Sequence, residues 1–246
     1  MTGLSPFKIL ATRFSWPHPS WAGKSTEEYN AWTENRIALF AKYTAKSIKN
    51  CYVKPDAWII LIGSDQEHVK SRLADILKDC NCHYNIAAYQ GLSVQATVMK
   101  AVDNISYPKP VITTRLDADD MVSSDFFATL SNIEYPFIGN ACISFCSGST
   151  FVANKEKYYH QSYPDNPFLS VFEYCRNPYE AQTVYFRMHT EVLAHVRHQI
   201  FPRTYYPMWA SVVHNENLEN KYLLDVSRVS FNETAVLHKR FGLSND

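Results

Sequence analysis

Hydrophobic runs alternate with amphipathic segments along the first half of the chain. Apolar and β-branched residues at 7–14, 57–63, 83–90 and 110–114 predict four strands. Between these runs, apolar residues recur at helical spacing, which predicts three helices. Strands and helices that alternate in this way are typical of a parallel sheet sandwiched by helices. We therefore expect an α/β fold with a mainly parallel central sheet flanked by helices.

Polar residues mark where the predicted helices begin. Ser25 is followed three residues later by Glu28, the spacing of a capping box. Ser64 and Glu67 repeat this spacing after the second strand, and Ser93 precedes the third helical pattern. Each of these positions predicts the first turn of a helix.

The second half of the chain is less regular. Residues 137–159 have the composition of strands, with a turn predicted at Ser147-Gly148. Residues 166–196 mix a short helix, a proline-bearing loop, a strand near 183–188 and another helix. The chain has no internal repeat, low-complexity tract or obvious linker, so a single domain over residues 1–246 is favoured.

An acidic cluster follows the fourth predicted strand. Asp117, Asp119 and Asp120 lie within four residues, directly after a buried strand. Neighbouring carboxylates repel one another and need a compensating cation, and Mg²⁺ typically takes one or two carboxylates together with substrate phosphates. An acidic loop that caps a helix starting near Ser123 or Ser124 is the structural alternative, and it accounts for one aspartate but not for three. The cluster therefore predicts a divalent-metal site.

Polar residues also follow two other predicted strands. Thr12 and Arg13 end the first strand, and Ser64 and Asp65 follow the second. In open α/β sheets, ligands bind beyond the carboxyl ends of the strands. We therefore expect these residues and the acidic cluster to form one site.

Composition narrows the range of functions. The 246 residues carry 24 basic and 24 acidic side chains, so no net charge attracts nucleic acid or anionic lipid. No signal peptide or membrane-length apolar run is present, and the six cysteines show no zinc spacing, which predicts a cytoplasmic protein with reduced thiols. A dinucleotide fingerprint, a phosphate-binding P-loop and a GxSxG nucleophile motif are all missing from the sequence.

Several blocks of the sequence resemble a known family. The run TTRLDADD at 113–120 resembles the GT-A glycosyltransferases, and the ordered blocks resemble the rhamnosyltransferase family within them. The blocks span roughly residues 11–220: ATRFSWP, RIALFAKYTAKSIKN, AWIILIGSD, VITTRLDADDMVSSDFF, NPFLSVFE and WASVVHNENLEN. The chain departs from the pattern in having GSD where an aspartate directly follows the strand. It also has Ala118 where a polar residue is commoner.

The resemblance implies a GT-A domain with a nucleotide-binding half at about 1–125 and an acceptor-side half at about 126–246. It implies an inverting enzyme that uses Mn²⁺ or Mg²⁺ to transfer rhamnose or a related hexose. The donor would be a dTDP-, UDP- or GDP-linked sugar, and the acceptor a saccharide of a surface polysaccharide or glycan. Such an enzyme would work in the cytoplasm or at the inner face of a membrane.

The resemblance also implies roles for individual residues. Contacts to the nucleotide sugar would come from Thr12, Arg13, Asp65, Arg115 and Asp117. Asp119 would be the principal metal ligand, shared with Asp117. Asp120 would be a second ligand or would orient Arg115. Arg115, Asp117 and Asp119 lie on one face if the strand stays extended, so Arg115 would hold the carboxylates or reach a phosphate.

A late histidine is the third expected metal ligand. His214 follows the apolar run 208–213 and opens a polar segment. GT-A enzymes often draw a late histidine to the metal, and neutral imidazole suits Mn²⁺. A histidine hydrogen-bonded to Asn217 is the structural alternative, and His238 is a rival ligand.

Glu173 is the candidate general base. It follows the apolar segment 168–172, so we expect it to be partly desolvated, which would raise its pKa toward a useful value. Glu180 and Asp165 are alternatives, and a solvent-facing Glu173 on a short helix is the structural alternative.

Two other functions fit parts of the pattern. Haloacid-dehalogenase-like phosphatases also carry Asp-x-Asp after a strand, although usually near the N-terminus and followed by Thr or Val rather than Asp120 and Met121. A non-catalytic carbohydrate- or calcium-binding module is the other alternative. A calcium loop would be expected to offer more widely spaced ligands and a glycine.

Overall fold

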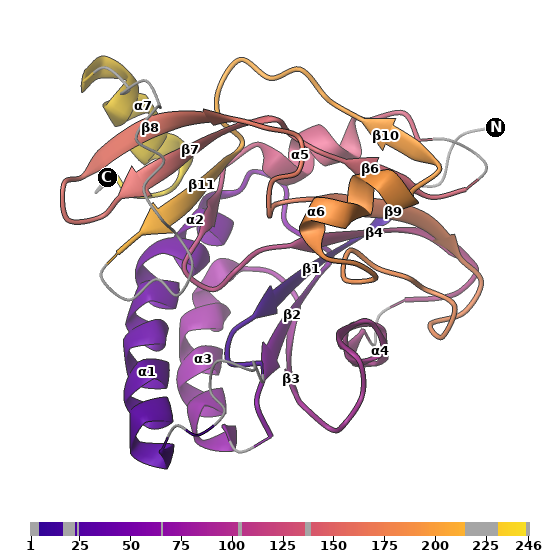
Figure 1. Ribbon diagram of the computed structural model, residues 1–246, viewed down its shortest axis with the longest axis horizontal. Helices are drawn as coiled ribbons and strands as arrows, with labels where there is room; N and C mark the ends of the chain where they lie inside the picture. The colour runs from indigo at the N-terminus through magenta and orange to yellow at the C-terminus, as the bar shows by residue number, and fades with distance from the viewer. Residues whose placement is uncertain are drawn as a thin grey trace.

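The computed structural model describes residues 5–16, 23, 25–64, 66–102, 105–135, 139–214 and 231–244. Seven strands form the main sheet in the order β10-β6-β9-β4-β1-β2-β3 (Figure 1). Their bounds are β1 Phe7–Arg13, β2 Ala57–Ile62, β3 Tyr84–Ala88, β4 Lys109–Arg115, β6 Ala141–Ile143, β9 Ser170–Cys175 and β10 His198–Ile200. β9 runs antiparallel to β4 and β6, and the other pairs are parallel. The predicted α/β fold with a mainly parallel central sheet is confirmed.

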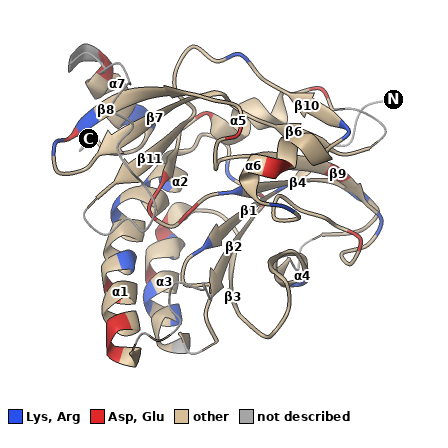
Figure 2. Cartoon of the chain, in the orientation of Figure 1, with Lys and Arg blue, Asp and Glu red and all other residues tan. Residues whose placement is uncertain are grey.

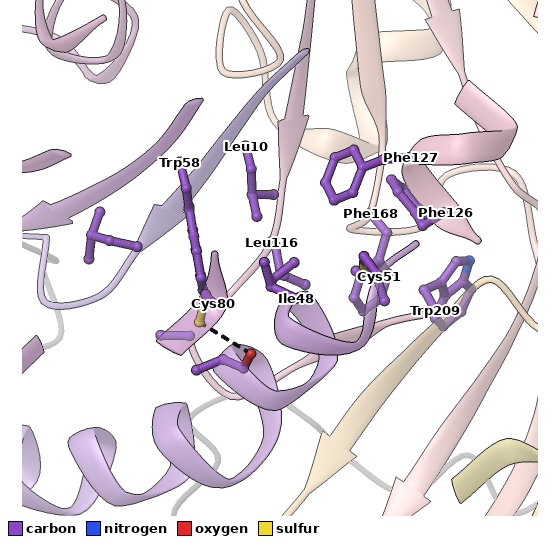
Figure 3. Close-up of a cluster of buried hydrophobic side chains, with 14 of the residues drawn as sticks. Leu10, Ile48, Cys51, Trp58, Cys80, Leu116, Phe126, Phe127, Phe168 and Trp209 are labelled. Carbon is purple, nitrogen blue, oxygen red and sulfur yellow. Dashed lines mark hydrogen bonds between the residues drawn. The ribbon is translucent and has the colours of Figure 1, made fainter. Parts of the chain in front are cut away.

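Helices cover both faces of this sheet because successive strand residues point to opposite sides. One long helical run, α1 Thr26–Leu39, the π-helical turn Phe40–Thr44 and α2 Ala45–Asn50, packs on one face with α3 Lys70–Leu77. Leu10, Trp58 and Leu116 point toward these helices (Figure 3). α4 Val94–Ala101 packs on the other face against Ile9 and Ile59.

Two of the three predicted helix starts are confirmed. Ser25 and Glu28 form the capping box, with Ser25 Oγ accepting from the Glu28 N–H at 3.2 Å. Ser93 Oγ accepts from the Ala96 N–H at 3.2 Å at the start of α4. The prediction for Ser64 is wrong, because a 3₁₀ turn at 67–69 intervenes and α3 begins at Lys70 without a side-chain cap.

A second, four-stranded sheet has the order β5-β11-β7-β8. Its strands are β5 Met121–Val122, β11 Trp209–Val213, β7 Ser147–Val152 and β8 Lys157–Ser162. The remaining helical segments are α5 Phe126–Ser131, α6 His189–Val192, α7 Phe231–Arg240 and short 3₁₀ turns at Lys78–Cys80 and Leu193–His195. Trp209 of this sheet stacks on Phe168 with ring centroids 4.6 Å apart, which joins the second sheet to the main core (Figure 3).

The second half departs from the sequence predictions at two places. Ser147 and Gly148 begin β7 rather than form a turn. A Cβ on Gly148 would overlap the indole of Trp209, so the glycine permits close packing between neighbouring strands. Residues 183–188 form a loop, and the strand in this region is β9 at Ser170–Cys175.

Candidate functional site

The acidic residues lie in a turn between the two sheets. β4 ends at Arg115, and the Leu116 N–H continues the ladder to the Ala11 carbonyl at 3.2 Å. The Asp120 N–H then donates to the Asp117 carbonyl at 3.3 Å, which closes a four-residue turn. β5 follows at once and pairs with β11. This connection places the carboxylates at the carboxyl edge of the main sheet, beside the second sheet.

Asp117 is held by two arginines. Arg115 Nη2 donates to Asp117 Oδ2 at 2.7 Å, and Arg13 Nη2 lies 3.6 Å from Oδ1. Burial by itself would raise the pKa of Asp117, but Arg115 and Arg13 together lower that pKa well below its usual range. Asp117 is therefore ionised and pairs the ends of β1 and β4.

Asp119 faces a different set of partners. Its Oδ1 lies 3.6 Å from Arg36 Nη2, and its Oδ2 lies 3.0 Å from His214 Nε2. Arg36 comes from α1, where its Nε donates to the Phe14 carbonyl at 2.7 Å and its guanidinium lies 4.9 Å from the Trp32 ring centroid. The basic Arg36 belongs to the last turn of α1, opposite the acidic first turn (Figure 2).

The turn changes the predicted arrangement of side chains. Arg115 and Asp117 do share a face and contact each other, as the strand alternation predicts. The chain does not stay extended as far as Asp119, so this third residue points to Arg36 and His214 instead. The structure thus brings His214 to the aspartates from the end of β11.

Asp120 is hydrogen-bonded to the backbone of the second sheet and to the long helical run. Its Oδ1 accepts from the Val212 N–H of β11 at 2.8 Å, and its carbonyl accepts from Thr44 Oγ1 at 2.9 Å. Burial, followed by the neighbouring charges of Asp119 and Asp117, raises the pKa of Asp120 well above its usual range. Asp120 therefore ties the turn to the second sheet and to the long helical run.

His238, the rival metal ligand, lies in an aromatic environment. Its ring centroid is 5.9 Å from that of Phe151 and 5.5 Å from that of Tyr158. Burial lowers the pKa of His238. The contact with Asp119 is made by His214 and not by His238.

The predicted nucleotide-binding residues at the first two strand ends fall in different places. Thr12 is buried, and its Oγ1 accepts from Trp58 Nε1 at 3.0 Å inside the core. Arg13 points to the opposite face, toward Asp117, with the Tyr185 ring centroid 5.7 Å from its guanidinium. Asp65 lies outside the described residues. Of Thr12 and Arg13, it is Arg13 that the structure places at the acidic turn.

Glu173 lies away from the aspartates. It pairs with Val111 near the start of β4, six residues before Asp117, which corresponds to about 20 Å along a strand. Its Oε2 and Oε1 accept from the Gln182 and Thr183 N–H groups at 2.9 and 2.8 Å. Burial raises the pKa of Glu173 while these two hydrogen bonds oppose the rise. This placement gives no support to the prediction that Glu173 is the general base.

Three residues of the cluster were missed at the level of sequence. These residues are Arg36, Tyr185 and His189. The Nδ1 atom of His189 lies 3.3 Å from Arg115 Nη1. Burial, followed by the charge of Arg115, lowers the pKa of His189. The i,i+4 spacing of Trp32 and Arg36 was a usable signal, because such residues meet on a helix. The loop that carries Tyr185, and the short helix α6 that begins at His189, offered none.

The cluster offers donors that suit a divalent cation. A carboxylate from Asp119 and an imidazole from His214 lie side by side, which is an O/N pair compatible with Mn²⁺. Asp117 adds oxygens that its arginines now share. Among the described residues, no group of three or more His, Cys, Asp or Glu side chains is arranged to hold a metal. Two protein ligands fit a metal completed by substrate phosphates.

Comparison with known proteins identifies the family. The family model described as "Putative rhamnosyl transferase" matches residues 1–223, and the chain belongs to this family. The family that the sequence blocks resemble is thus confirmed, and membership supports a transferase. No curated protein matches the chain.

Two solved structures are similar in fold. The inositol-1-phosphate CTP transferase from T. maritima matches with a TM-score of 0.38 and 7% identity over 85% of each chain. The 4-diphosphocytidyl-2C-methyl-D-erythritolsynthase from Anaerococcus prevotii matches with a TM-score of 0.34 and 12% identity over 96% of this chain and 97% of that chain. Among the described residues, no helix is long and apolar enough to cross a membrane.

Proposed function

We propose that this chain is a metal-dependent glycosyltransferase that moves rhamnose or a related hexose from a nucleoside-diphosphate sugar to a saccharide acceptor. The dTDP-, UDP- and GDP-linked sugars are the candidate donors, for surface polysaccharide or glycan synthesis. The observation that carries the proposal is the acidic turn after β4, where Asp119 and His214 meet beside three arginines. The inverting course stays a prediction.

The arginines supply what a diphosphate needs. Arg13, Arg36 and Arg115 come from β1, α1 and β4 and converge on two aspartates. A guanidinium is always charged and matches phosphate geometry with two parallel donors. We assign these three side chains to the two phosphates, whose negative charge grows as the sugar leaves.

Asp119 and His214 would hold the metal, with Asp117 contributing to the metal or the ribose. A bound Mn²⁺ or Mg²⁺ acts as a Lewis acid on the leaving diphosphate. The diphosphate would draw the arginines away from the carboxylates, so their oxygens become available for the cation. Metal and diphosphate would therefore bind cooperatively.

The nucleoside end of the donor would lie along the ends of β1 and β3. Trp16 and Tyr89 form an edge-to-face pair there, with ring centroids 4.9 Å apart. Both side chains are partly exposed, and aromatic rings are effective partners for a base. Because Asp117 lies at the same edge of the sheet, the order base, ribose, diphosphate follows that edge.

The test is thermal stabilisation by a panel of UDP-, dTDP- and GDP-sugars with Mn²⁺. A ligand at one hundred times its Kd stabilises the native state by about 2.7 kcal/mol, which raises Tm by about 5–10 °C for a chain of this size. We expect one nucleotide class to produce this shift. No shift with any donor would overturn the proposal.

Variants locate the effect. Asp119→Asn should abolish the Mn²⁺-dependent shift, and His214→Ala should weaken it. Asp75→Asn, at an exposed carboxylate paired with Lys78, and His238→Ala are the matched controls, which should respond like the wild type. Wild-type Mn²⁺-dependent binding in Asp119→Asn would remove the metal site from this turn.

A further inference from the structure

The loop between β9 and α6 is fastened along the sheet face that carries Arg115. In the middle of the loop, the N–H groups of Gln182 and Thr183 donate to the two carboxylate oxygens of Glu173 at 2.9 and 2.8 Å. One residue later, the Val184 N–H donates to Thr113 Oγ1 at 2.7 Å. These three bonds take up consecutive backbone donors, of which those of Thr183 and Val184 would otherwise be buried without partners.

The strand register explains how the loop approaches the site. Glu173 pairs with Val111, so its side chain lies on the same face as those of Val111, Thr113 and Arg115. Successive anchors on this face are about 6.6 Å apart along β4. The loop therefore runs from the start of β4 toward its carboxyl end, where Asp117 lies.

The far end of the loop and His189, the first residue of α6, contact the two arginines of Asp117. The Tyr185 hydroxyl donates to the Ala11 carbonyl at 3.0 Å, and its ring lies against Arg13. His189 Nδ1 lies 3.3 Å from Arg115 Nη1. A guanidinium has no acceptor, so Nδ1 accepts and the neutral imidazole carries its proton on Nε2.

The conformation of the loop includes a strained backbone at Thr183. Thr183 has a φ of +59°, a left-handed backbone that a β-branched residue rarely adopts. Both Thr183 and Glu173 are buried, so the carboxylate acts on the strained residue away from competing water. Glu173 is thus the group that offsets the strain.

We propose that Glu173 is a positioning residue: through residues 182–189 it sets Tyr185 and His189 against Arg13 and Arg115, the arginines assigned to the donor diphosphate. This inference rests on the proposed function for the role of the arginines. The structural connection from Glu173 through residues 182–189 to Arg115 does not depend on the proposed function.

The first test is amide hydrogen exchange in Glu173→Gln. The glutamine NH₂ would face a backbone N–H where a carboxylate oxygen now accepts, so one or both hydrogen bonds break. Exchange at one or both of the Gln182 and Thr183 amides should accelerate roughly 10- to 100-fold, the scale for hydrogen bonds to a charged group. Glu180→Gln, at an exposed position in the same loop, is the matched control and should leave these amides unchanged.

The second test reads the other end of the loop. In Glu173→Gln, the NMR shifts of the His189 imidazole nitrogens should move as the contact with Arg115 loosens, and nucleoside-diphosphate affinity should fall several-fold. Thr113→Val, which removes only the acceptor of the Val184 N–H, should move the same signals in the same direction.

The outcomes separate the two ideas. Unchanged exchange or unchanged His189 signals in Glu173→Gln would overturn the positioning role, whether or not nucleotide binds. Altered signals with unaltered nucleotide affinity would also overturn it. If the wild type binds no nucleoside diphosphate, the proposed function is wrong. The link from Glu173 to Arg115 is then tested by the NMR shifts of the His189 imidazole alone. A lost transfer rate with wild-type exchange and affinity would instead identify Glu173 as the general base.

Discussion

At the scale of single residues, the sequence predicts those site members whose type is unusual for their place. Three aspartates directly after an apolar strand are such a case, and so is His214 after the apolar part of β11. Arg36 offered only its helical spacing from Trp32, and His189 is an ordinary residue for the start of a short helix, so its contact with Arg115 alone reveals it. Thr12 was misplaced because strand alternation turns it away from Arg13.

Asp120 gives a prediction that separates hydrogen bonding from charge. Asp120→Asn keeps an oxygen for the Val212 N–H, so the free energy of unfolding should stay within about 1 kcal/mol of the wild-type value at neutral pH. Asp120→Ala leaves that N–H buried without a partner and should cost about 2–3 kcal/mol. Urea unfolding measures both values. Equal losses in the two variants would show that the negative charge, and not the acceptor oxygen, matters here.

At the scale of elements, local patterns were sufficient for β1 to β4 and their helices. β1, β2 and β3 are each an apolar run followed by a helix, and these three strands lie side by side in chain order, with β4 added beside β1. β9 and the second sheet pair residues far apart in the chain, such as Ala210 with Ser149. No local signal specifies such pairs, and the Ser147-Gly148 turn was predicted for this reason.

β7 requires a residue without a side chain at Gly148, because the Trp209 indole occupies the space of a Cβ. Gly148→Ala would push a methyl group into the Trp209 indole, which also donates its Nε1–H to the Phe145 carbonyl at 2.7 Å. Overpacking at such a site should lower the free energy of unfolding by about 3 kcal/mol. In the Trp209→Leu background the same alanine should cost much less, and a double-mutant cycle by urea unfolding measures the difference. An unchanged cost in that background would contradict a clash with the indole.

Over the whole molecule, the net charge is zero, but oppositely charged side chains from distant elements are concentrated in one cluster of ion pairs. Arg13, Arg36 and Arg115 meet Asp117 and Asp119, which joins β1, α1 and β4 across a partly buried edge of the sheet. His214 extends this network to the second sheet. The candidate site and the junction of the two sheets are therefore the same place, and stability and function share its ion pairs.

This coupling predicts how stability depends on pH. The folded pKa of Asp117 lies well below the unfolded value of about 3.9, so on acidification the unfolded chain binds the proton first. The contribution of Asp117 is complete above about pH 4 and is lost below it, by about 1 kcal/mol at pH 3. Asp117→Asn lacks this contribution, so its free energy of unfolding should fall less between pH 6 and pH 3 than that of the wild type. Urea unfolding followed by tryptophan fluorescence provides both curves, and Asp75→Asn, at an exposed carboxylate, should run parallel to the wild type. Parallel curves for Asp117→Asn and the wild type would mean that the arginines do not hold this carboxylate ionised in the folded chain.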